Sequence, residues 1–192
     1  MNRARQISGE GLVYLGLGSN LGDRAAYLLR AVSALVAGGL EVRAVSSIYE
    51  TAPVDRLDQP SFLNLALAVS GAGLEPFSLL AACLEIETRL GRERTIPRGA
   101  RTIDLDLLLF KDLIIDETRG GLNLALPHPR MHRRRFVLTP MAEIAPEVRH
   151  PVLGETMRQL LGRVDDSAAV EIYPGGPDGI QLGSIQPCNK VN

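Results

Sequence analysis

The sequence predicts an α+β fold in which helices cover a mostly antiparallel sheet, and three observations predict it. Four short segments show apolar residues alternating with period two, as half-buried strands do. Two longer segments between them carry apolar residues at helical spacing. Glycine and proline mark the boundaries between segments, and there is no internal repeat of the kind that indicates a solenoid.

In the first half of the chain, strands and one helix alternate. Residues 12–17 alternate as a first strand, and residues 23–37 form an amphipathic helix that a Gly-Gly pair ends. Residues 40–48 alternate again as a second strand. After a polar loop that contains proline, residues 62–69 form a third strand.

The second half begins with a helix whose ends are well marked. Pro76 stands at its first position and Gly91 at its end. Residues 102–110 alternate as a fourth strand. The basic segment 127–136 opens a third helix, which Pro140 is expected to limit because proline is poorly tolerated inside a helix.

The order of these elements is strand, helix, strand, strand, helix, strand. This is the ferredoxin-like, split βαβ plan, so we expect three layers, α/β/α. A short last helix at 156–161 closes a single domain over residues 12–164. Residues 1–11 are expected to be an N-terminal extension, and residues 165–192 a flexible C-terminal tail.

The composition sets limits on function. The chain has 192 residues, 45% of them hydrophobic and 22% charged, which suits one globular domain. Its formal net charge of −1 lacks the basic excess of a dedicated nucleic-acid binder. Two cysteines form neither a disulfide framework nor a four-ligand zinc site. The first apolar stretch is too short for a signal or membrane segment, so we expect a cytoplasmic protein without a membrane partner.

The sharpest chemical feature is the pair Asp104 and Asp106. Residues two apart on a strand point to the same side, with Cα atoms roughly 6.6 Å apart, and Leu108 and Phe110 are expected on that side too. Such carboxylates can hold hard cations such as Mg²⁺ together with phosphate oxygens, and can bridge two ions. A solvated polar face is the alternative for an isolated pair. Arg101, three residues upstream, favours a polyphosphate site.

Two basic clusters accompany this pair. The first is a loop of four arginines, which taken alone suits a solvated surface loop slightly better: Arg92, Arg94, Arg98 and Arg101. The second lies at residues 128–135, and its alternative is a basic helix face that meets solvent or RNA. On one helix, Arg130, Arg133 and Arg134 would share a face while Arg135 points elsewhere.

Amide and aromatic residues suggest a place for a flat heterocycle. Residues 58–64 place Phe62 and Asn64 at the start of the third strand, where a ring can stack and an amide can both donate and accept. An asparagine there that only satisfies backbone groups is an equally good interpretation. Residues 18–20, Gly-Ser-Asn, match neither a P-loop nor a dinucleotide motif, and are interpreted as a helix N-terminal turn.

Together these segments resemble the hydroxymethyldihydropterin pyrophosphokinases of the folate pathway, over residues 13–161. The most specific part is residues 99–108, Gly-Ala-Arg-Thr-Ile-Asp-Leu-Asp-Leu-Leu. Supporting segments follow in the family's order: 18–20, 49–51, 58–60 with Phe62 and Asn64, 126–128 and 143–146. The resemblance implies transfer of pyrophosphate from ATP to the hydroxymethyl group of 6-hydroxymethyl-7,8-dihydropterin, releasing AMP.

The resemblance also implies roles for single residues. Asp104 and Asp106 would hold two Mg²⁺ ions with ATP, and Arg92 and Arg101 would be catalytic. The ATP contacts it implies are Arg92, Arg94, Arg101, His128, Arg134 and Glu87. The pterin contacts it implies are Phe62 and Phe136 on either side, with Asn64, Thr51 and Val54. For Glu87, a glutamate on a helix surface is an equally good account.

The chain departs from the family pattern at two positions. Many members carry a tryptophan in the arginine loop, where this chain has no Trp and offers Arg98. Asn123 stands where some members have an arginine.

Two other functions stay open at this point. The segment 130–135 suits a ferredoxin-like RNA-binding module, although aromatic residues make up only 4% of the chain. The carboxylate pair also suits another magnesium-dependent nucleotide transferase. We expect ATP and the pterin as substrates, no nucleic-acid partner, and a monomer.

Overall fold

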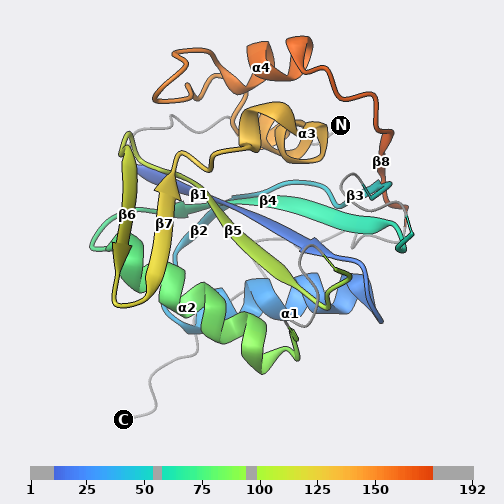
Figure 1. The fold of residues 1–192 in the computed structure, drawn as a ribbon, viewed down its shortest axis with the longest axis horizontal. Helices are drawn as coiled ribbons and strands as arrows, with labels where there is room; N and C mark the ends of the chain where they lie inside the picture. Colours follow the sequence, from blue (N-terminus) through green and yellow to red (C-terminus); the bar gives the residue numbers. More distant parts are fainter. Residues whose placement is uncertain (1–10, 54–57, 94–98, 175–192) are drawn as a thin grey trace.

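A six-stranded sheet forms the middle of the molecule in the computed structural model, which describes residues 11–53, 58–93 and 99–174 (Figure 1). Its order is β5-β1-β4-β3-β8, with β2 also paired to β4, and all of these pairings are antiparallel. The strands are β1 (Leu12–Ser19), β2 (Val42–Val45), β3 (Tyr49–Thr51), β4 (Phe62–Ser70), β5 (Asp104–Phe110) and β8 (Val170–Ile172).

The strand order confirms the ferredoxin-like plan. β1 lies between β5 and β4, and β2 and β3 pair in turn along β4. The predicted second strand, 40–48, corresponds to β2, whereas β3 lies just past the predicted end and pairs with the same strand, β4. β2 and β3 together take the place beside β4 that the second strand has in the split βαβ plan.

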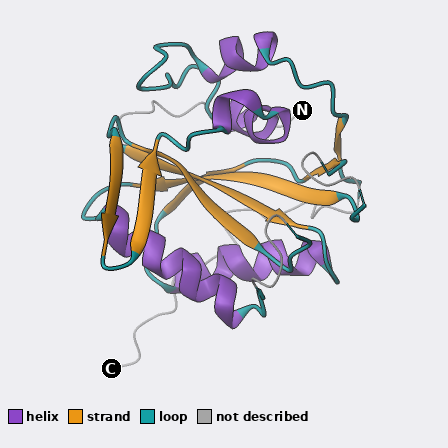
Figure 2. Ribbon diagram, in the orientation of Figure 1, coloured by secondary structure: helices purple, strands orange, loops and turns teal. Residues whose placement is uncertain are grey.

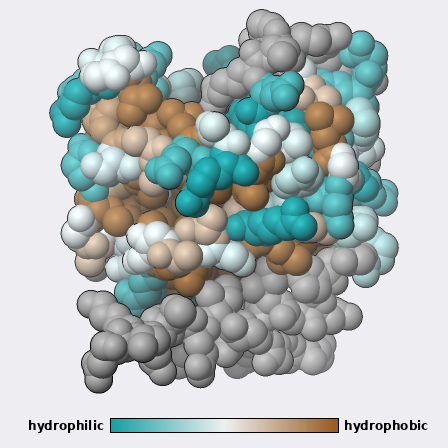
Figure 3. Space-filling model, turned by 90° about the horizontal axis from the view of Figure 1, so that it is seen from below, coloured by the Kyte–Doolittle hydropathy of each residue, from teal (hydrophilic) through white to brown (hydrophobic). Residues whose placement is uncertain are grey.

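Helices cover both faces of the sheet, which confirms the three layers (Figures 1 and 2). On one face lie α1 (Arg24–Ala37) and α2 (Pro76–Arg89), around the larger apolar cluster. On the other lie η1 (Met131–Arg133), α3 (Arg135–Ile144) and α4 (Met157–Arg163), around a second cluster. Seen from the side of α1 and α2, hydrophilic residues cross the surface between apolar ones (Figure 3).

The helix starts follow from capping residues. Asp23 precedes α1 and accepts a hydrogen bond from the N–H of Ala26 at 3.1 Å. Pro76 occupies the first turn of α2, as predicted. Thr156 and Gln159 form a reciprocal capping box at α4, which confirms the predicted short last helix.

A bulge in β5 corrects the predicted faces of that strand. Leu107 pairs with Leu15 and Leu109 with Tyr14, so Leu108 is the extra residue. An extra residue reverses the alternation after it. Phe110 therefore packs in the cluster under α1 and α2, and the expectation that it shares the face of the carboxylates is wrong.

A hairpin that periodicity did not reveal follows β5. It consists of β6 (Ile115–Arg119) and β7 (Leu122–Leu126), paired in antiparallel fashion. Gly120 and Gly121 form its turn with φ of 58° and 78°, which residues with a Cβ rarely adopt.

Pro140 does not limit the third helix, contrary to expectation. α3 begins at Arg135 and continues through Pro140 to Ile144. Proline cannot donate to the carbonyl four residues before it, so one helical hydrogen bond is lost. Burial of Val137, Leu138 and Met141 on the same helix offsets this loss.

The basic cluster does not lie on one helix either. η1 ends at Arg133, and Arg134 is extended, with φ −124° and ψ 109°. The predicted common helical face for Arg130, Arg133 and Arg134 is therefore wrong. Local backbone geometry, rather than helical periodicity, decides which of them face the sheet.

The C-terminal segment joins the sheet. β8 lies inside the expected tail and pairs with β3, Val170 opposite Thr51, so the prediction of a tail from residue 165 is wrong for residues 165–174. Three residues are too few for a periodic signal. The other expected terminal residues, 1–10 and 175–192, lie outside the described residues. Within the described ranges, none of the helices is long and apolar enough to span a membrane.

Candidate active site

A pocket lies between the sheet and α3. Its walls come from β1, β3, β4, β5 and α3, together with the loops before β4 and β5. The structure brings together there eight of the predicted site residues: Thr51, Phe62, Asn64, Arg101, Asp104, Asp106, Arg134 and Phe136. Val54, Arg94 and Arg98 lie outside the described residues.

Strand register places the polar groups of the pocket. Gly18 and Gly16 on the central strand β1 are opposite Asp104 and Asp106 on β5. On the other side of β1, Gly18 is opposite Asn64 on β4. The glycines carry no side chain, so the floor between the carboxylates and the amide stays open.

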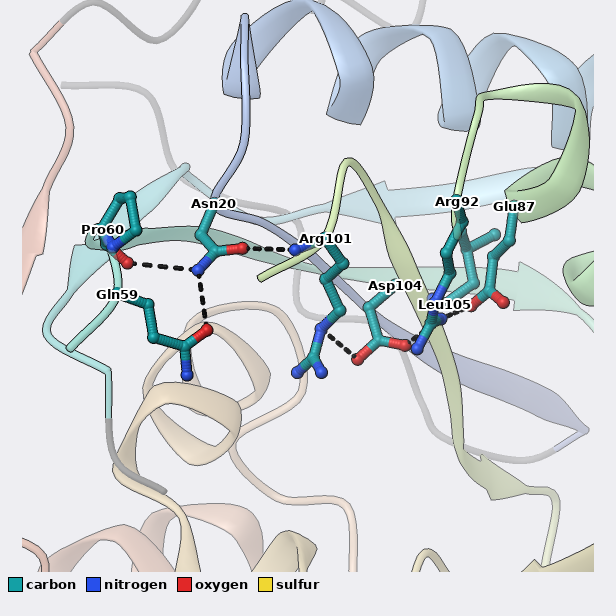
Figure 4. Close-up of polar contacts among 8 residues, drawn as sticks. All are labelled: Asn20, Gln59, Pro60, Glu87, Arg92, Arg101, Asp104 and Leu105. Atoms are coloured by element: carbon teal, nitrogen blue, oxygen red, sulfur yellow. Dashed lines mark hydrogen bonds and ion pairs between the residues drawn. The ribbon is translucent and has the colours of Figure 1, made fainter. Parts of the chain in front are cut away.

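Two arginines hold Asp104. Arg101 Nε lies 3.0 Å from one carboxylate oxygen, and Arg92 pairs with the other (Figure 4). The Asp104 side chain is 17% exposed, so these ion pairs are partly shielded from water. Arginine-rich surroundings of this kind also suit phosphate groups.

Asp106 is the second carboxylate of the pocket. Burial first, and the charge of Asp104 second, raise the pKa of Asp106 above its ordinary value, while Arg134 and Arg101 oppose the rise. A further positive charge nearby, such as a metal ion, would stabilise the ionised form of this carboxylate. No cluster of three or more histidine, cysteine or acidic residues suited to a metal occurs in the described part of the chain. Magnesium needs only one or two carboxylates beside substrate phosphates and water, so this pair fits it.

Glu87, on α2, contacts two residues next to the carboxylate pair. It is 2% exposed, accepts from the N–H of Leu105 at 2.8 Å and pairs with Arg92 (Figure 4). The alternative of a glutamate on a helix surface is therefore wrong. Its implied contact with ATP stays a prediction, but the geometry gives it a clear second role, which is to orient Arg92.

Asn20 is a site residue that sequence reasoning missed. Its buried amide oxygen accepts from the N–H of Arg101 at 2.7 Å. Its amide nitrogen donates to Oε1 of Gln59 and to the carbonyl of Pro60, both at 3.3 Å (Figure 4). Asn20 thus joins the loop before β4 to the loop before β5. The interpretation of residues 18–20 as a helix turn omitted this bridge.

The other half of the pocket suits a flat ring. Asn64 donates to the Thr51 hydroxyl at 2.8 Å, so its amide contacts a side chain rather than only the backbone. The guanidinium of Arg101 lies over the Phe62 ring at 5.2 Å, and that of Arg134 over the Phe136 ring at 5.4 Å. The two rings therefore link the aromatic half to the charged half.

His128 lies beside the pocket rather than in its lining. Its N–H donates to the carbonyl of Leu108 at 2.9 Å. Burial, and then the charges of Arg134 and Arg130, lower the pKa of His128 to about 4. A neutral imidazole at pH 7 can donate one hydrogen bond to a phosphate but adds no charge. Asn123, in contrast, is exposed on β7.

Fold and site together define a class of protein. It is a ferredoxin-like α+β domain whose pocket joins a carboxylate pair and arginines to an aromatic half, a site for phosphate chemistry on a ring-bearing molecule. The chain belongs to the 7,8-dihydro-6-hydroxymethylpterin-pyrophosphokinase (HPPK) family, whose sequence model matches residues 14–146.

Two relatives show how far the similarity extends. The chain is 47% identical over 138 residues to the 2-amino-4-hydroxy-6-hydroxymethyldihydropteridine pyrophosphokinase of Bacillus subtilis (strain 168), covering 71% of this chain and 80% of that one. It is 45% identical over 155 residues to the protein of the same name from Methylorubrum extorquens (strain ATCC 14718 / DSM 1338 / JCM 2805 / NCIMB 9133 / AM1), covering 80% and 94%.

A solved structure has the same fold. Wild-type HPPK-DHPS of Plasmodium falciparum superposes with a TM-score of 0.62 at 18% identity, over 79% of this chain and 44% of that chain. Family membership confirms the resemblance based on residues 99–108 and the expected enzyme class, a pyrophosphokinase. It favours that class over the RNA-binding module.

Proposed function

We propose that this protein transfers pyrophosphate from ATP to the hydroxymethyl group of 6-hydroxymethyl-7,8-dihydropterin in a magnesium-dependent reaction of folate synthesis. The observation that carries the proposal is a single pocket in which an aromatic and amide half meets Asp104, Asp106 and Arg101. The names of the relatives support the pterin substrate. The cytoplasm is the proposed compartment.

The reaction needs alignment and charge neutralisation more than a protein nucleophile. The hydroxyl oxygen of the pterin forms a bond to the β-phosphorus of ATP, and the bond from that phosphorus to the α–β bridging oxygen breaks. AMP leaves with the bridging oxygen, and the hydroxyl proton passes to solvent. Two magnesium ions held by Asp104 and Asp106 would neutralise phosphate charge and lower the pKa of the hydroxyl.

The residues of the chain divide these tasks. Phe62 and Phe136 would stack on the pterin, while Asn64 and Thr51 hydrogen-bond its edge and so orient the hydroxymethyl group toward the carboxylates. Arg101, already aligned by Asn20 and Asp104, would bind the phosphates. Arg92 pairs with both Asp104 and Glu87, and these ion pairs hold its guanidinium beside the Asp104 carboxylate, where the phosphates would bind.

The test is AMP release from ATP and Mg²⁺, with and without 6-hydroxymethyl-7,8-dihydropterin. We expect release that requires the pterin, stops when EDTA removes magnesium, and falls at least about 100-fold in Asp104→Ala and in Asp106→Ala. Asp112→Ala, an exposed aspartate just past β5, is the matched control and should keep full activity.

Two outcomes would contradict the proposal. AMP or ADP formed at the same rate without the pterin would indicate another nucleotide-using enzyme. Near-normal activity of Asp106→Ala with magnesium present would show that the carboxylate pair does not hold the metal.

A further inference from the structure

The segment 165–174 passes from α4 across one side of the molecule to the sheet edge (Figure 1). Its last part, β8, pairs with β3, where Val170 is opposite Thr51. Tyr173 then donates its N–H to the carbonyl of Ile48 at 2.9 Å. One end of this segment is thus fixed to the strand that supplies Thr51 to the pocket.

Asp166, at the other end, contacts the first residue of α3. The N–H of Arg135 donates to Oδ2 of Asp166 at 2.8 Å, and Arg135 Nε donates to the carbonyl of Asp166 at 2.7 Å. Oδ1 of the same carboxylate accepts from the N–H of Ala168 at 3.0 Å. Both carboxylate oxygens therefore have defined partners.

This contact supplies what the local sequence of α3 lacks. The first N–H groups of a helix have no acceptor within the helix, and a neighbouring side chain usually provides one. The residue before α3, Arg134, makes no such side-chain contact. Asp166 provides the acceptor from 31 residues further along the chain, and its negative charge suits the positive end of the helix dipole.

The capped residue lies between two pocket residues. Arg134 and Phe136 flank Arg135 in the chain, and both line the pocket beside Asp106. A shift of the first turn of α3 would move the guanidinium and the ring together. Pro140, in the following turn, has no N–H to donate, so hydrogen bonding at the start of α3 is the more important for the backbone there.

We propose that Asp166 is a positioning residue of the active site: by capping α3 it sets the places of Phe136 and Arg134, and so the affinity for substrates. Asp166 is not among the residues that line the pocket. The assignment of substrates rests on the proposed function, whereas the capping contact does not.

The experiment compares Asp166→Ala and Asp166→Asn with wild type. Asp165→Ala is the matched control, because it removes the same charge from the exposed neighbouring residue. Three quantities are measured in the full chain: hydrogen exchange at the Arg135 amide, the Kd values for ATP and for the pterin, and kcat. The exchange rate of the Arg135 amide measures directly whether its hydrogen bond to Asp166 is kept. A change in the Kd values without a matching change in kcat distinguishes a positioning effect from a general loss of folded protein.

In Asp166→Ala we expect exchange at Arg135 to rise about fivefold and both Kd values to rise by about the same factor, with kcat within about twofold of wild type. Asp166→Asn should restore part of the affinity, because its amide oxygen still accepts one hydrogen bond. Asp165→Ala should match wild type in all three measurements.

Two results would overturn the proposal. Faster exchange with unchanged Kd values would show that Asp166 stabilises the helix without positioning the pocket. Values that match Asp165→Ala throughout would show that the cap has no effect. A wild type that binds ATP but does not turn over the pterin would instead contradict the proposed function, and ATP affinity, through Arg134, would still decide the role of Asp166.

Discussion

Gly18 and Asn64 lie opposite each other on β1 and β4, so close that a Cβ on Gly18 would be 3.0 Å from Oδ1 of Asn64. The backbone of Gly18 is not in the left-handed region, so its conformation does not require glycine. Glycine is required here because the Asn64 side chain approaches the backbone so closely. The amide that fills the space is the one that donates to Thr51.

Gly18→Ala should therefore displace the Asn64 amide from the pocket. We expect the KM for the pterin to rise about tenfold and the free energy of unfolding to fall by about 1 kcal/mol, from overpacking. Steady-state kinetics and urea unfolding measure both. Gly162→Ala is the control: it lies on α4 with nothing within 4 Å of the added Cβ, and should stabilise by about 0.5–1 kcal/mol. Equal pterin KM values for both variants would contradict this role for Gly18.

Glu87→Ala should be strongly destabilising. It removes the acceptor of the buried Leu105 N–H and one of the two carboxylates, Glu87 and Asp104, that pair with Arg92. We expect the free energy of unfolding to fall by about 3 kcal/mol, because a buried N–H is left without its acceptor and the guanidinium of Arg92 loses one of its two carboxylate partners. Glu85→Ala, an exposed glutamate on the same helix, should change it by less than about 0.5 kcal/mol. Similar unfolding midpoints for the two variants would show that the Glu87 network adds little.

The Glu143 carboxylate connects the end of α3 to the residues before and within β3. It accepts from the N–H and the hydroxyl of Ser47, each at 2.9 Å, and from the Tyr49 hydroxyl at 3.0 Å. Burial, followed by the charge of Glu143, raises the pKa of Tyr49, so the phenol remains a donor. A double-mutant cycle of Tyr49→Phe and Glu143→Gln should give a coupling energy of about 1 kcal/mol.

Glu147→Gln is the control for this cycle. Glu147 is exposed and pairs with Arg158 at 2.8 Å on the surface. Its loss should change the free energy of unfolding by less than about 0.5 kcal/mol. Strict additivity of Tyr49→Phe and Glu143→Gln would show that the two groups do not stabilise each other.

The His132 and His150 rings meet edge to face, with centroids 5.7 Å apart. Burial lowers the pKa of both; Arg133 and Arg163 add to the effect on His132, and His132 adds to that on His150. A histidine whose pKa is lower in the folded state binds fewer protons than the unfolded chain does. The free energy of unfolding should therefore fall as pH drops below about 6.5.

His132→Asn tests this pair. Urea unfolding at pH 7.5 and at pH 5.5 should show a smaller loss of stability in the variant than in wild type, because His150 no longer faces a second imidazole. His128, whose pKa is also lowered, acts in the same direction in both proteins and cancels in the comparison. An unchanged difference between the two pH values would exclude the pair as a source of the pH dependence.

Much of the fold follows from local pattern. β1, β4, α1 and α2 lie within two or three residues of their predicted bounds, because each buries a face that its own apolar spacing defines. The β6–β7 hairpin also has a local signal, the Gly120-Gly121 pair, although the periodicity of its two short strands does not reveal it. β8 had none, since three residues owe their strand to pairing with β3.

The site divides in the same way. Asp104, Asp106 and Arg101 belong to one strand and the loop before it, so their proximity is visible in the sequence. The placement of Phe62, Asn64 and Phe136 in the same pocket was implied only by family resemblance, and the bridge made by Asn20 was missed. Its partners Gln59 and Arg101 are 39 and 81 residues away along the chain.

The sequence by itself therefore determined the alternation of strands and helices and the carboxylate pair on one strand face. Both features depend only on residues that are close together along the chain. Tertiary structure alone decided that the bulge at Leu108 turns Phe110 to the opposite layer, and that Asp166 caps α3. The reason is physical. Register shifts and caps of this kind satisfy hydrogen-bonding groups that meet only after the layers have packed, and no periodicity in either segment records its distant partner.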